Sequence, residues 1–165
     1  MILGLSIAAF TKLHVAISLI GIVSGLVVLY GMLGATGWTA LFLATTVLTS
    51  VTGFMFPATT VTPAAIFGAI SLAVLAVALL ALYVFQANGA WRWIYVVTAL
   101  FALYLNVFVL VVQAFQKIAF LHSLAPNGSE PPFLVAQTIV LLTFLWLGFG
   151  AVRKFHPEAL APARR

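Results

Sequence analysis

Five long runs of apolar residues, none containing Lys, Arg, Asp or Glu, make up most of the chain. They cover residues 13–33, 38–56, 64–87, 93–116 and 133–152. About 20 apolar residues are needed for a helix to cross the hydrocarbon core of a bilayer. A helix also satisfies its own backbone hydrogen bonds, which lipid cannot do. The pattern predicts an all-α integral membrane helical bundle with five transmembrane helices.

The second run is the least apolar of the five because it carries six hydroxyl side chains. Threonine and serine can hydrogen-bond to the backbone of their own helix, so this run can still cross. If it does not cross, the number of transmembrane helices falls to four. The hydroxyl side chains are those of Thr39, Thr45, Thr46, Thr49, Ser50 and Thr52.

Turn-forming residues separate the apolar runs. They lie at 34–37, between Pro57 and Pro63, at 88–89 and at 126–132. All seven prolines fall in these connections or near the C-terminus. Proline is a common cause of sharp kinks, so five straight helices are expected. The whole of 1–165 is expected to form one transmembrane domain, with 153–165 as a basic cytoplasmic tail.

Composition agrees with a lipid environment. Hydrophobic residues make up 65% of the 165 residues and charged residues 5%, against roughly 25% in typical soluble domains. The formal charge of +5 comes from scattered or terminal residues. It therefore does not predict nucleic-acid binding, which needs a clustered basic face.

The distribution of basic residues predicts an orientation. Cytoplasmic loops are enriched in Lys and Arg. With five helices, the side holding the C-terminus receives Arg92, Arg153, Lys154, Arg164 and Arg165, and the other side receives Lys12 and Lys117. The sequence therefore predicts a multi-pass protein of a cell inner membrane, with the N-terminus outside and the C-terminus cytoplasmic.

A polar face runs along the fourth apolar segment. Asn106 and Gln113 lie seven residues apart, nearly two helical turns, and Lys117 continues this face toward the outside. His14 and Gln137 are expected at the same level on other helices. One interpretation is a ligand-binding pocket open to the outside. The other is hydrogen bonding between helices, with Lys117 reaching the membrane surface.

Two further polar groups fall near the outer surface, His122 and Glu130. Glu130 could pair with His122 or Lys117, exchange protons, or simply be solvated. His14 and His122 are the only pair that could supply nitrogen ligands to haem, so haem is not favoured and no cofactor is predicted. No metal site is predicted, and the chain has no cysteine.

The GxxxG spacing of Gly21 and Gly25 predicts a helix-packing face, because glycine lets two helices approach closely. This face could join two copies of the chain or seat another helix of the same copy. No zinc-protease, P-loop or serine-hydrolase motif occurs in the sequence. The sequence therefore favours a non-enzymatic role.

Three stretches resemble a group of small, uncharacterised multi-span inner-membrane proteins of bacteria. They are FTKLHVAISLIGIVSGLVVLYGML, GAWRWIYVVTALFALY, and LNVFVLVVQAFQK followed by APNGSEPPFLVAQ. The resemblance implies a bacterial inner-membrane setting and no particular activity.

Three functional hypotheses follow. The first is a self-associating bundle or an accessory subunit of a larger membrane complex. The second is a binding or transport protein for a small molecule or ion, using the outer polar pocket. The third is a redox protein that holds haem or a quinone.

Overall fold

The computed structural model describes residues 1–31, 36–58, 60 and 62–155. Regular structure in this part of the chain is helical. The helices are α1 (Ile7–Tyr30), α2 (Thr36–Gly53), α3 (Pro63–Leu79), α4 (Trp91–Lys117), α5 (Ala119–Leu124) and α6 (Pro131–Lys154), and the π-helical segment η1 (Leu80–Val84) follows α3 directly.

Four of these helices are long and apolar enough to cross a membrane: α1, α3 with η1, α4 and α6. The Thr-rich second run forms α2, whose apolar part, Trp38–Gly53, is shorter than the four long helices. The prediction of an all-helical bundle with several apolar spans is confirmed. The count of five crossing helices stays a prediction.

The helix boundaries differ from the predicted ones by a few residues. The largest difference at a helix start is at α1, which begins at Ile7, six residues earlier than predicted, because the Ser6 hydroxyl accepts a hydrogen bond from the Ala9 amide and caps the helix. At the other end of the chain, α6 continues through Lys154, so Arg153 and Lys154 belong to this helix. The helix thus extends two residues past the predicted span, and the basic cytoplasmic tail at 153–165 stays a prediction. Residues 156–165 lie outside the described part of the chain.

The third apolar run is not α-helical to its end, a feature that the sequence did not predict. Its last turn widens into η1, where the Phe85 amide donates to the Leu80 carbonyl five residues earlier. A wider turn of this kind needs no proline, so the positions of the prolines could not reveal it. The helix then ends with Gln86 and Ala87 in the left-handed region, each with φ of 51°.

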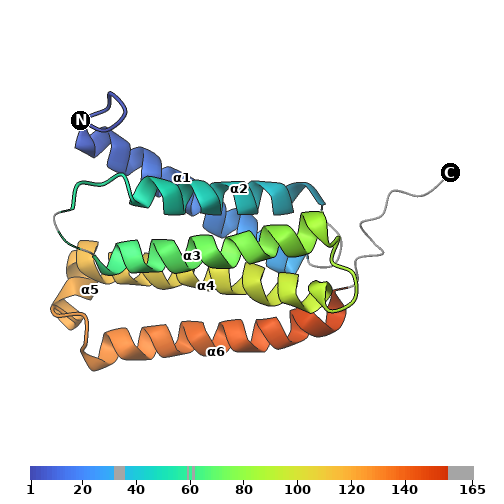
Figure 1. Ribbon diagram of the computed structural model, residues 1–165. Helices are drawn as coiled ribbons and strands as arrows, with labels where there is room; N and C mark the ends of the chain where they lie inside the picture. The colour runs from blue at the N-terminus through green and yellow to red at the C-terminus, as the bar shows by residue number, and fades with distance from the viewer. Residues whose placement is uncertain (32–35, 59, 61, 156–165) are drawn as a thin grey trace.

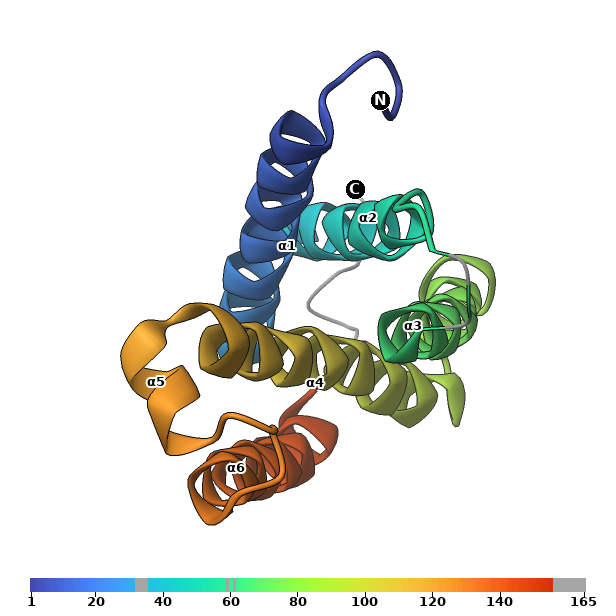
Figure 2. The ribbon, with the colours of Figure 1, turned by 90° about the vertical axis from the view of Figure 1, so that its left-hand side faces the viewer.

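The helix α4 lies at the centre of the molecule, with α1, α2 and α3 on one side and α6 on the other (Figures 1 and 2). Small and branched side chains of α4 form its buried face. Val96 and Ala102 are completely buried there, and Leu103 nearly so. This face allows the neighbouring helices to pack closely on α4.

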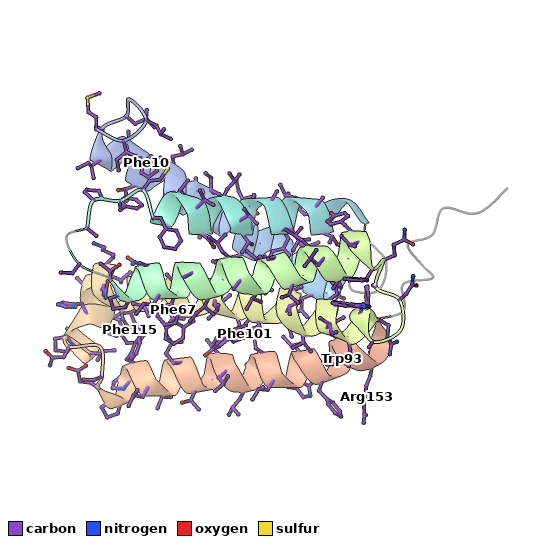
Figure 3. The ribbon with its side chains drawn as sticks, in the orientation of Figure 1. Phe10, Phe67, Trp93, Phe101, Phe115 and Arg153 are labelled. Atoms are coloured by element: carbon purple, nitrogen blue, oxygen red, sulfur yellow. The ribbon has the colours of Figure 1, made fainter. Side chains whose placement is uncertain are left out.

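The helix α6 packs chiefly against α4. Aromatic rings fill much of this contact: Tyr104 of α4 lies 5.7 Å from the Phe144 ring of α6, edge to face. Tyr104 also contacts Phe108, whose ring lies 5.1 Å from that of Phe67 on α3. Figure 3 labels Phe67 and Phe101 along the same side of the bundle, between α3, α4 and α6.

The bundle has two polar ends. The "His122 end" carries Lys12, Lys117, His122 and Glu130, at the starts of α1 and α6 and around α5. The "Arg153 end" carries Arg92, Arg153 and Lys154. At the Arg153 end the Arg92 guanidinium donates to the Phe155 carbonyl at 2.8 Å, which caps α6 and ties its end to the start of α4.

Candidate functional site

The polar side chains of the apolar helices meet in pairs inside the bundle. His14 of α1 and Thr52 of α2 are hydrogen-bonded, with Nδ1 and Oγ1 2.8 Å apart. The Phe56 ring lies edge-on to the imidazole at 5.3 Å. The same Thr52 hydroxyl donates to the Leu48 carbonyl of its own helix, so it accepts from the imidazole N–H. His14 therefore joins α1 to α2.

A second pair joins α2 to α4. The Asn106 amide nitrogen donates to the Thr46 hydroxyl at 3.3 Å, and the Thr46 side chain is completely buried. One helical turn further along α2, the Ser50 hydroxyl donates to Ser71 of α3 at 3.1 Å, and both serines are buried. The hydroxyl-rich α2 thus bonds to α1, α3 and α4.

Gln137 of α6 makes the polar contact between α6 and α4. Its Nε2 donates to the Phe108 carbonyl at 3.2 Å, while its buried Oε1 has no hydrogen-bond partner in the described part of the chain. The hydroxyl oxygen of Thr49 on α2 is likewise buried and has no hydrogen-bond partner in the described part of the chain. A buried acceptor without a donor is costly, so Gln137 marks a place where a donor group would be stabilised.

Gln113 and Lys117 do not join these pairs, because both side chains are exposed toward the His122 end of α4. The start of α1 leans away from the rest of the bundle at this end (Figures 1 and 2). The five residues predicted to line one pocket therefore lie in separate surroundings. Asn106 bonds to Thr46, His14 bonds to Thr52, and Gln137 bonds to the backbone of α4. Gln113 and Lys117 are at the surface.

The glycine face of α1 is turned inward. A Cβ atom on Gly25 would lie 2.5 Å from Leu103 Cδ1 and 2.8 Å from the Phe42 ring. On Gly21 it would lie 3.2 Å from the Thr45 hydroxyl. Of the two arrangements left open by the GxxxG spacing, the structure has the one in which the glycines seat helices of the same chain.

A cavity of about 180 Å³ lies at the His122 end, between α4, α5 and α6. The Phe115 and Phe133 rings, 5.4 Å apart and edge to face, form part of its wall. Figure 3 labels Phe115 at this end of the bundle. The polar side chains at the cavity are Gln116, His122 and Asn127, and the remaining lining residues are Val112, Ala125, Pro126 and Gly128.

The Glu130 carboxylate holds the loop beside this cavity. It accepts hydrogen bonds from the backbone and side-chain nitrogens of Asn127, at 2.9 and 2.8 Å, and from the Ser129 amide at 3.0 Å. The bond from the Asn127 backbone contributes most to lowering the pKa of Glu130 to about 2. Glu130 is therefore ionised at neutral pH and holds its own loop through these hydrogen bonds.

The two described histidines lie on different helices. His14 bonds to Thr52, and His122 lines the cavity. In the described part of the chain, no three His, Asp or Glu side chains come together as a metal site would need. The cavity was not predicted from the sequence. The sequence signal for its edge was the three-residue spacing of Asn127 and Glu130, which is typical of a turn closed by a hydrogen bond between an acidic side chain and the backbone.

Comparison with models of protein families, with curated proteins and with solved structures finds no match to this chain.

Proposed function

We propose that the protein is a non-enzymatic component of a bacterial inner membrane that crosses it five times and associates with a second copy of itself through α6. The observation that carries this proposal is how little of α6 is buried within the bundle. Only 11% of its most apolar stretch is buried, against 22–33% in the other three long helices. Much of α6 is thus left for lipid or for another helix.

One side of α6, next to the face that packs on α4, has a pattern suited to helix association: Ala136 and Gly150 are half-buried there and Thr143 is exposed. Ala136, Thr143 and Gly150 recur every seven residues and share one face. A Cβ atom on Gly150 would meet nothing within 4 Å. Beside them stand two large side chains, Ile139 and Trp146, which are 60% and 74% exposed.

Small and large side chains next to each other on one helix favour a second copy as the partner. In a two-fold dimer the same face meets itself, so Ile139 and Trp146 of one copy can fill the space above Thr143 and Gly150 of the other. Close approach at small residues is the usual basis of helix association in lipid. Because Gly21 and Gly25 of α1 face the inside of the bundle, α6 offers the better surface for a second copy.

The charges of the two ends support the proposed orientation. Arg92, Arg153 and Lys154 lie at one end, and the positive-inside rule assigns that end to the cytoplasm. Exposed amphipathic aromatics gather at the same end, as expected of anchors at headgroup level. They are Tyr30, Trp38, Tyr83 and Trp93.

The proposal is tested by measuring the dimer fraction of the full chain in nanodiscs or mild detergent over a range of protein-to-lipid ratios. We expect Thr143→Leu and Gly150→Leu to weaken association at least about tenfold, which corresponds to about 1.4 kcal/mol. Thr138→Leu is the matched control. Thr138 is also exposed on α6 and also bonds only to its own helix backbone, but it points elsewhere.

Equal weakening by Thr138→Leu and Thr143→Leu would contradict the assigned face. A wild-type chain that stays monomeric at every ratio, while co-purifying with a different membrane protein, would replace self-association by an accessory role.

A further inference from the structure

The Arg153 end gathers positive charge, and no described carboxylate lies near it. Arg92, Arg153 and Lys154 lie at this end. Glu130, the one acidic residue in the described part of the chain, lies at the His122 end. An anion from the surroundings is therefore attracted to the Arg153 end.

The Arg153 guanidinium lies on the outer surface of α6. Its central carbon is 3.9 Å from the centre of the Phe149 ring, one turn earlier on the same helix. Both side chains are exposed, and Figure 3 shows Arg153 projecting away from the rest of the bundle. The stacking contact holds the positive charge against the side of an apolar helix, at the edge of the region that faces lipid.

This stacking leaves the hydrogen-bond donors of Arg153 available. A guanidinium carries five N–H groups in its own plane, and a ring that lies over its face uses none of them. Arg153 makes no hydrogen bond or ion pair with another described residue. Two parallel N–H groups of a guanidinium match two oxygens of a phosphate, so Arg153 is suited to hold one.

A second guanidinium comes to the same end of α6 from α4. The Arg92 Nη1 donates to the carbonyl of Phe155, two residues after Arg153. Trp93, the next residue of α4, is 49% exposed, and an exposed indole near a helix end is typical of the headgroup level. Basic groups between membrane helices at this level bind anionic lipid headgroups.

An exposed apolar stripe of α6 leads to Arg153. Leu142, Leu145 and Phe149 are 58–61% exposed and recur at spacings of three and four residues, which places them on one side of the helix. Acyl chains can lie along this stripe, with the headgroup at Arg153. The buried residues of the opposite side are Gln137, Phe144 and Ala151.

We propose that the Arg153 end of α4 and α6 binds an anionic phospholipid of the phosphatidylglycerol type. Arg153 donates to two phosphate oxygens, the charge of Arg92 adds to the attraction, and one acyl chain lies along the stripe of α6. The site uses residues of one copy. It therefore rests on the membrane location proposed above and not on self-association through α6.

The charge of the headgroup makes the site selective. A zwitterionic phospholipid such as phosphatidylcholine carries the same phosphate and the same acyl chains. Its ammonium group, however, would lie among the cations of the Arg153 end, and no described carboxylate is there to accept it. A lipid with a net negative charge avoids this repulsion.

The test measures quenching of tryptophan fluorescence in the purified full chain, in detergent micelles, by phospholipids with brominated acyl chains. Phosphatidylglycerol should quench saturably, with an apparent affinity at least about tenfold higher than that of phosphatidylcholine with the same chains. Millimolar inorganic phosphate should not displace it, because phosphate lacks the acyl chains. Displacement by phosphate would assign the arginines to a soluble anion and overturn the lipid site.

Variants of α6 test the assigned contacts without disturbing the fold, because Arg153 and Phe149 contact each other at the surface. Arg153→Gln should weaken binding of phosphatidylglycerol at least about fivefold, and Phe149→Leu about two- to fivefold. Lys117→Gln is the matched control. It removes one exposed positive charge at the His122 end and should change the affinity less than about twofold.

Equal weakening by Arg153→Gln and Lys117→Gln would show a diffuse attraction between charges and overturn the site, as would equal affinities of the wild type for the two phospholipids. A wild-type chain that stays monomeric and still selects phosphatidylglycerol would support the lipid site while contradicting self-association.

Discussion

Glu130 is the residue whose protonation has the clearest structural consequence. Its folded pKa is about 2 against an ordinary value of 4.5, so the carboxylate stabilises the fold above pH 4.5 and loses that effect as the pH falls toward 2. Glu130→Gln should lower Tm at pH 7 and make Tm less dependent on pH between 4.5 and 2. A Tm difference between the two proteins that stays constant over this range would contradict the assignment.

Asn106 is the residue whose hydrogen bond can be measured most directly. Its partner is Thr46, and bonds between polar side chains of membrane helices contribute about 0.6 kcal/mol on average. A double-mutant cycle with Asn106→Leu and Thr46→Val should give a coupling free energy of about 0.5–1 kcal/mol. A coupling near zero would mean that the pair does not stabilise the fold, and Gln113→Leu should show no coupling to Thr46→Val.

The packing of α1 against α2 and α4 depends on close approach at Gly25. Because a Cβ there would overlap Leu103 and Phe42, Gly25→Ala should lower the free energy of unfolding by about 1–3 kcal/mol, the usual cost of overpacking. Gly150→Ala on α6 is the matched control. Its Cβ meets nothing, and the change should be neutral or stabilising by about 0.5–1 kcal/mol, because alanine favours helix over glycine. Similar unfolding free energies for both variants would contradict the packing.

The sequence predicted the helices better than their contacts. Hydropathy alone gave 93–116 for the helix observed at Trp91–Lys117, because a run that long has few alternatives in lipid. The six-residue helix α5 is too short for such a signal. The spacing of Asn106 and Gln113 placed them on one face, but their different surroundings depend on where α1 and α2 pack. Periodicity within one helix does not contain that information.

At the level of the whole molecule, the direction of α2 determines the topology. In the structure α2 runs back along α1, so residues 54–58 lie at the same end as the start of α1 (Figure 1). If α2 crosses the bilayer, Ser6, Thr60 and Ser123 all lie on one side of the membrane and Gly89 on the other. If α2 does not cross, Ser6 and Gly89 share a side, and Thr60 and Ser123 share the opposite one.

These alternatives can be separated because the chain has no cysteine of its own. Ser6→Cys, Thr60→Cys, Ser123→Cys and Gly89→Cys each introduce a single reactive thiol. With a membrane-impermeant maleimide on intact spheroplasts, we expect labelling at the first three positions and at Gly89→Cys only after lysis. Labelling of Thr60→Cys only after lysis, with Ser6→Cys accessible, would leave four crossing helices. Labelling of Gly89→Cys alone would reverse the orientation that the positive-inside rule predicts for Arg92 and Arg153.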